Sequence, residues 1–116
     1  MSISTAQSSL RTPTRRFAPD DLAFARAWEV HAPGLGGWTV QMERDDEWGD
    51  SLLVDPPLVY GDGFVVRPEE GGTTVTWAMG ARRVASLREA MLLICPLSPD
   101  ALAAVELLAA APNLEF

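Results

Sequence analysis

The hydrophobic and polar positions of the chain follow a helical period first and a strand period later. After a polar start, Leu22, Ala25 and Trp28 recur every three residues, which places them on one face of an amphipathic helix. Pro33 disfavours helical geometry at the residue before it and is followed at once by a glycine, so the helix ends there. The pattern predicts a helix over residues 20–31.

The middle of the chain alternates with a period of two, which is typical of strands with one wet face. In the first of these runs, Trp38, Val40 and Met42 share a face. Proline and glycine pairs separate the runs and mark turns or strand ends. We therefore expect about four antiparallel strands, formed by WTVQMER (38–44), SLLVD and LVY (51–55 and 58–60), FVVRP (64–68) and TTVTWAM (73–79).

The last third of the chain carries helix signals. Ser86 and Glu89 have the spacing of a capping box that opens a helix, which Pro96 ends. Ser98 and the proline after it begin a second helix, which runs to Pro112. These boundaries predict two consecutive helices after the strands.

The order of these elements defines the fold class. One face of an antiparallel sheet has to be covered, and the helices are the cover that the sequence offers. We expect a two-layer α+β domain over residues 18–116, with an N-terminal helix, an antiparallel meander of about four strands, and two C-terminal helices packed on one sheet face. Residues 1–17 are rich in Ser, Thr and Arg and lack acid, which is typical of a flexible N-terminal arm.

The charge distribution argues against several kinds of partner. The chain has nine arginines, no lysine and sixteen acidic residues, for a net charge of −7. Three of the arginines lie in residues 1–18, so the rest of the chain is more acidic still. An acidic body repels phosphates, so we expect no nucleic-acid partner. The chain has no apolar run of bilayer length and no secretory h-region, so we expect a cytoplasmic protein without a membrane partner.

Few residues are available for catalysis or for metal binding. Cys95 is the sole cysteine, which excludes an internal disulfide framework and a cysteine-based zinc site. His31 is the sole histidine, so no transition-metal ligand spacing exists. No Gly-x-Ser-x-Gly motif is present, and Ser86 and Ser98 are accounted for as helix caps. We expect no cofactor, no metal and no catalytic residue, and a non-catalytic role is favoured.

The stretch MERDDEWGDS (42–51) is the densest cluster of charge in the chain. An EF-hand loop that began at Asp45 or Asp46 would place a proline where a bidentate glutamate is required. The stretch therefore fails the calcium template, and Asp and Gly at this density favour a turn between two strands. Its carboxylates are Glu43, Asp45, Asp46, Glu47 and Asp50.

Trp48 lies inside this acidic stretch, whereas Trp28, Trp38 and Trp77 fit core positions of a helix or a strand. Two alternatives are open for Trp48: its side chain folds back over the sheet edge, or it is exposed as an anchor for a partner. Interface hot spots favour tryptophan with a polar rim. We hypothesise that a partner protein with a basic surface binds here, at Trp48, Asp45, Asp46, Glu47 and Asp50.

The final helix and the overall composition lead to a functional expectation. The run ALAAVELLAAA (101–111) nearly lacks the charged face of a solvated helix, so it is deeply buried or pairs with another chain, and we expect a homodimer. We expect a small acidic protein-interaction domain of an accessory, chaperone-like or inhibitor type. The alternative is a small enzyme or ligand-binding protein with a carboxylate-lined pocket, near Asp45, Glu47, Asp50 or Asp55.

Overall fold

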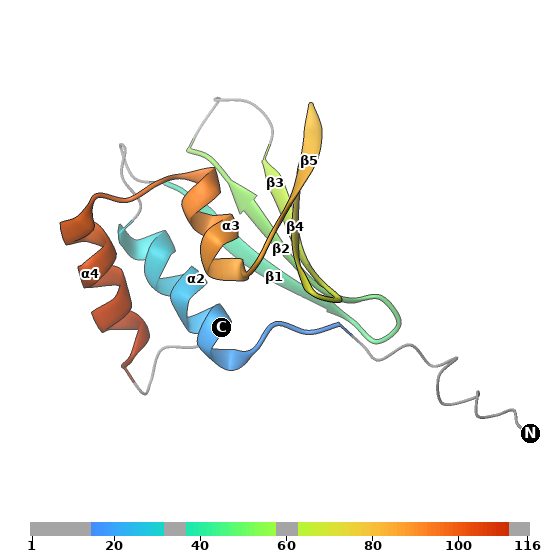
Figure 1. Cartoon of the computed structure of the whole chain (residues 1–116), viewed down its shortest axis with the longest axis horizontal. Helices are drawn as coiled ribbons and strands as arrows, with labels where there is room; N and C mark the ends of the chain where they lie inside the picture. Colours follow the sequence, from blue (N-terminus) through green and yellow to red (C-terminus); the bar gives the residue numbers. More distant parts are fainter. Residues whose placement is uncertain (1–14, 32–36, 58–62, 112–116) are drawn as a thin grey trace, which may run out of the picture.

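The fold is an antiparallel sheet with helices on one of its faces (Figure 1). The computed structural model describes residues 15–31, 37–57 and 63–111. The strands pair in chain order, which gives the sheet order β1-β2-β3-β4-β5. The elements are α2 (Pro19–His31), β1 (Thr39–Asp45), β2 (Gly49–Asp55), β3 (Phe64–Glu69), β4 (Gly72–Trp77), β5 (Gly80–Val84), α3 (Leu87–Ile94) and α4 (Pro99–Ala109). The predicted α+β class and element order are confirmed, with five strands in place of about four.

The additional strand is β5, at one edge of the sheet. It pairs with β4 in a register that sets Arg82 opposite Val75 and Arg83 opposite Thr74. Its residues are exposed, apart from the half-buried Val84. A short, charged edge strand carries no apolar alternation, so the hydrophobic pattern that predicted the other strands is missing from it.

The core lies between the sheet and the helices. One sheet face contributes the buried residues Val40, Leu52, Val54, Val66 and Val75. Helices α2 and α3 cover this face, and α4 packs against α2, so that α2 stands between α4 and the sheet (Figure 1). This second helical layer explains why the final helix is apolar on its inner side, where Val105 is fully buried.

Three tryptophans contact the core, as the sequence pattern predicts. Trp28 is fully buried, and its ring meets Trp38 edge to face, with ring centroids 5.2 Å apart. The indole N–H of Trp28 donates to the backbone carbonyl of Cys95, with a donor–acceptor distance of 3.3 Å. Trp77 is half-buried and lies 6.3 Å from Phe64 between ring centroids. Such aromatic pairs contribute about 0.5–1.5 kcal/mol beyond their buried area.

Both predicted helix caps are present. The Ser86 hydroxyl accepts a hydrogen bond from the N–H of Glu89 at 3.2 Å, and the Glu89 carboxylate accepts one from the N–H of Ala85 at 3.1 Å. Ser98 caps α4 in the same way, by accepting from the N–H of Ala101 at 3.2 Å. The bonds accepted by Ser86 and Ser98 satisfy N–H groups that the first turn of a helix leaves without a partner. The bond accepted by Glu89 binds the residue before the Ser86 cap.

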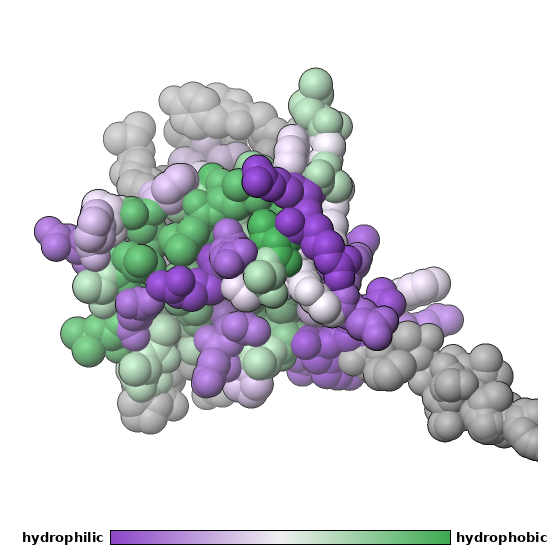
Figure 2. All heavy atoms as spheres, in the orientation of Figure 1, coloured by the Kyte–Doolittle hydropathy of each residue, from purple (hydrophilic) through white to green (hydrophobic). Residues whose placement is uncertain are grey.

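Several expectations fall outside the described residues: the arm up to residue 14, the helix stop signals at Pro33 and Pro112, and the strand residues 58–60. Within the described ranges, no helix is long and apolar enough to cross a membrane. Figure 2 shows hydrophobic side chains reaching the surface over the helices, and hydrophilic ones gathered along the neighbouring part of the sheet.

Candidate interaction site

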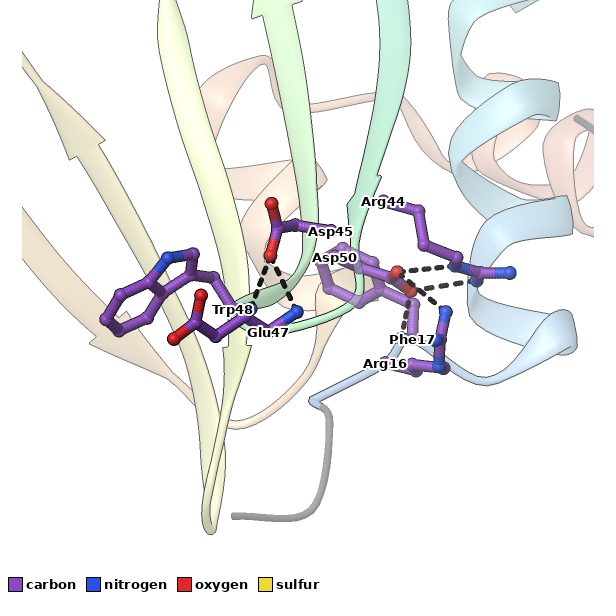
Figure 3. A network of polar contacts seen from close by, with 7 residues as sticks. All are labelled: Arg16, Phe17, Arg44, Asp45, Glu47, Trp48 and Asp50. Carbon is purple, nitrogen blue, oxygen red and sulfur yellow. Dashed lines mark hydrogen bonds and ion pairs between the residues drawn. The ribbon is translucent and has the colours of Figure 1, made fainter. Parts of the chain in front are cut away.

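The acidic stretch forms the turn of the β1–β2 hairpin. Asp45 pairs with Gly49 across the two strands, so residues 46–48 make the turn itself. One carboxylate oxygen of Asp45 accepts hydrogen bonds from the backbone N–H groups of Glu47 and Trp48, each with a distance of 2.7 Å (Figure 3). Gly49 follows with a φ of 95°, which glycine adopts without strain. The prediction of a turn between two strands is confirmed.

Trp48 is exposed at the end of this hairpin. Its relative exposure is 77%, and it takes part in no ring contact with any residue that the structure describes. Of the two alternatives for its side chain, the exposed one is found. Asp45, Asp46 and Glu47 are exposed around it. We call residues 45–48 the hairpin tip.

Asp50 lies apart from the hairpin tip and faces inward (Figure 3). Its side chain is fully buried and binds Arg44 through two hydrogen bonds, of 2.7 Å from Nε and 3.0 Å from Nη2. Arg16 lies 3.6 Å from the same carboxylate. The backbone N–H of Phe17 donates to it at 2.9 Å. Through these contacts, Asp50 joins the hairpin to the segment of Arg16 and Phe17. It is not part of the exposed acidic surface.

These contacts change the acidity of Asp50. Burial by itself raises the pKa of this carboxyl, because it penalises the charged form. The hydrogen bonds from Arg44 and from the N–H of Phe17, together with the charges of Arg44 and Arg16, outweigh that effect and hold the pKa below its ordinary value. The carboxylate is therefore charged at neutral pH and matched by positive charge.

Arg16, Phe17 and Arg44 are residues of this network that the sequence pattern did not single out. The position of Asp50 two residues before Leu52 puts both side chains on the helix-facing side of β2. Hairpin pairing then sets Arg44 directly opposite Asp50. Had the predicted strand begun at Gly49, as β2 does, the inward side chain of Asp50 and its pairing with Arg44 would both have followed from the sequence. The contacts of Asp50 with Arg16 and Phe17 join distant parts of the chain, so no local sequence pattern indicates them.

Residues 15–17, at the end of the predicted arm, pack against the hairpin. The side chain of Phe17 is only 5% exposed, and the backbone carbonyl of Arg15 accepts a hydrogen bond from the N–H of Asp50 at 2.7 Å. A Cβ atom on Gly49 would stand 2.3 Å from that carbonyl oxygen. Glycine is therefore required here for two reasons, its positive φ and the close approach of a second backbone segment.

No metal centre is apparent in the part of the chain that the structure describes: no three His, Cys, Asp or Glu side chains gather to hold an ion. Cys95 is half-buried against the core, and burial raises the pKa of its thiol, which disfavours the reactive thiolate. His31 is exposed at the end of α2.

The described surface includes an open groove and a smaller pocket. An open groove of about 690 Å³ runs between α2 and β1, beside Arg26, Glu29 and Glu43. A smaller pocket of about 230 Å³ lies between α3 and strands β3, β4 and β5. Neither is lined by any of the acidic residues named for a carboxylate-lined pocket, which are Asp45, Glu47, Asp50 and Asp55.

No protein-family model matches the chain, and no curated protein or solved structure matches it either. Indications of function therefore come from the molecule itself. The hairpin tip is the feature at which a large apolar side chain, a fixed backbone and a cluster of charge coincide.

Proposed function

We propose that this protein is a small, acidic, non-catalytic interaction domain that binds a basic protein surface through its hairpin tip. The observation that carries the proposal is the exposure of Trp48 on a turn whose backbone is fixed by Asp45. An accessory, chaperone-like or inhibitor-type role is consistent with the size and the net charge of −7 of the chain.

The chemistry of the hairpin tip supports a protein partner. A tryptophan supplies a large contact area and loses little side-chain entropy on binding, so it is a frequent hot-spot residue. The carboxylates of Asp45 and Glu47 surround it and favour arginine or lysine on the partner. Asp50 supports the turn from inside through its contacts with Arg44 and Phe17.

The proposal is tested by comparing variants as baits for partners from the source cell. Trp48→Ala should lose the partners that the wild-type protein captures. Met79→Ala is the matched control, because Met79 is 89% exposed in the β4–β5 turn and its removal also deletes an apolar side chain from a hairpin. If the Trp48→Ala variant captures the same partners with the same yield as Met79→Ala, the hairpin tip is not the binding site.

The acidic rim is tested separately by charge. Glu47→Gln should weaken capture and leave the fold intact, since Glu47 is exposed and only its backbone N–H bonds to Asp45. Binding of the wild-type protein should also weaken as ionic strength rises, because the Debye length falls from about 10 Å at 0.1 M to about 3 Å at 1 M. Capture that is indifferent to both changes would contradict a basic partner.

The second part of the proposal is that the protein forms a homodimer through the outer side of α4. Leu107 is 78% exposed there, while the opposite side of the helix packs on α2. Leu107→Glu should dissociate the dimer in size-exclusion chromatography with light scattering. Val30→Glu, at a 63% exposed position on α2, is the control and should not. A wild-type protein that is monomeric at micromolar concentration would overturn self-association and would leave the hairpin-tip proposal unaffected.

A further inference from the structure

The pocket beside α3 combines an apolar interior with a single charge. Its volume is about 230 Å³. Figure 2 shows hydrophobic residues gathered around α3 and hydrophilic ones bordering them on the side of β5. The lining residues are Phe64, Val75, Trp77, Arg82, Leu93 and Ile94.

Arg82 is the charged residue of this pocket. It lies opposite Val75 in the sheet register, and Val75 is buried beneath the helices, so both side chains leave the sheet on the helix-covered face. Arg82 is exposed and makes no hydrogen bond or ion pair with any residue in the described ranges. Other arginines do bind oxygen acceptors: Arg16, Arg26, Arg44, Arg67, Arg83 and Arg88.

We infer that this pocket binds a small carboxylic acid with an aromatic or branched alkyl body, whose carboxylate pairs with Arg82. Ligand sites are typically apolar clefts in which a few polar groups fix the orientation of the ligand. A guanidinium without a protein partner presents two parallel N–H groups that match a carboxylate. The tilted pair of Phe64 and Trp77, with ring centroids 6.3 Å apart, supplies an aromatic wall for the body.

The size of the pocket limits the ligand. Pockets that hold drug-sized ligands measure about 300–1,000 Å³, and this pocket is smaller than that range. At roughly 30 Å³ per water-sized group, it holds a body of about eight such groups. A single aromatic ring with a short acidic chain fits this limit, whereas a nucleotide or a peptide does not.

The end of α3 determines which way the ligand lies. Leu93 and Ile94 belong to the last turn of this helix, which has no basic residue to balance the negative end of its dipole. The carboxylate of the ligand is repelled from that end and attracted to Arg82 on β5. The apolar body therefore lies against α3, and the acid points toward the sheet edge.

The test is a titration of the ¹⁵N-labelled full chain, with 3-phenylpropionate as the probe. The indole N–H of Trp77 and the amides of Leu93 and Ile94 should shift during the titration. The neutral 3-phenylpropionamide has the same apolar body and should bind about tenfold more weakly, because a charge-assisted hydrogen bond is lost.

Two variants test whether Arg82 is the residue that pairs with the carboxylate of the probe. Arg82→Gln should bring the affinity for 3-phenylpropionate down to that for the amide. Arg83→Gln is the matched control, because this substitution removes the same charge from the other face of β5. There, the side chain of Arg83 binds Glu69. The inference is overturned if the pocket signals do not shift at millimolar probe, if acid and amide bind equally, or if the two variants weaken binding equally.

Discussion

Asp50 connects two segments of the chain that are 33 positions apart, since its carboxylate binds the backbone of Phe17. It also neutralises Arg44, which lies opposite in the hairpin. A buried charge that loses its partner is costly, because the remaining group is desolvated without compensation. The inward carboxylate therefore contributes more to stability than the exposed acids of the same turn.

The first prediction concerns the charge of Asp50. Asp50→Asn should lower the free energy of unfolding by about 1–3 kcal/mol, at the lower end because the side chain of Arg44 is 43% exposed and screened by water. Glu47→Gln removes one charge from the same hairpin and should change stability by less than about 0.5 kcal/mol. Urea unfolding at neutral pH measures both. Equal losses for the two variants would contradict the role given to Asp50.

The second prediction is the pH dependence of this contribution. The pKa of Asp50 is lowered in the folded protein, whereas in the unfolded chain an aspartate titrates near about 3.9. The stabilisation is therefore complete above the unfolded pKa and is lost as pH falls through the folded one. The difference in unfolding free energy between wild type and Asp50→Asn should be constant near neutrality and shrink below about pH 4. A difference that grows on acidification would contradict the assignment.

The third prediction concerns the close contact between Gly49 and the backbone of Arg15. Gly49→Ala should cost about 1–3 kcal/mol and release residues 15–17, because the added methyl group collides with the backbone of Arg15. Gly71→Ala is the control: Gly71 also has a positive φ, of 79°, but its Cβ would meet only a flexible arginine side chain. Urea unfolding compares the two, and hydrogen exchange at Phe17 reports the release. Similar losses for both would mean that backbone strain alone matters.

At the scale of elements, the sequence predicted what local chemistry specifies. Helix α3 begins directly after its cap Ser86, and α4 directly after its cap Ser98, because serine caps and prolines act within a few residues. Strand β5 was missed since an exposed edge needs no apolar alternation. The turn was predicted from its composition, but the burial of Asp50 and the exposure of Trp48 depend on strand register and on distant contacts that composition does not contain.

The fourth prediction concerns the cap of α3. Ser86→Ala should lower the free energy of unfolding by about 1 kcal/mol, because the N–H of Glu89 loses its acceptor. Combined with Glu89→Ala, the loss should be less than the sum of the single losses, since both residues belong to one capping interaction. Urea unfolding of the two single variants and the double variant forms the cycle. Strict additivity would contradict a coupled cap.

At the scale of the whole molecule, the two edge strands of the sheet, β1 and β5, differ in their contacts with other elements. On β1, the N–H of Val40 donates to the Glu29 carboxylate from α2 at 2.8 Å. On β5, no described element lies beyond the strand. Unpaired strand edges are sites where other strands add, so β5 is the more accessible edge.

The fifth prediction follows from this asymmetry. In hydrogen exchange monitored by NMR, the amides of the central strand β3 should exchange most slowly, because two strands lie on each side of it in the sheet. The amide of Val40 should exchange more slowly than those amides of β5 that point away from β4. Glu29→Gln should speed up exchange at Val40 and leave β5 unchanged. An unchanged rate at Val40 would show that Glu29 does not protect this edge.

The bond between the Arg15 carbonyl and the N–H of Asp50 also has a practical consequence. Any affinity tag or fusion protein placed ahead of Arg15 leaves the folded body beside Gly49, next to the turn that carries Trp48. A tether on that side therefore joins the described chain close to Trp48. The described chain ends at Ala111, just after α4, and α2 stands between α4 and the sheet (Figure 1). We therefore expect a tether on the Ala111 side to obstruct a partner of Trp48 less than one on the Arg15 side.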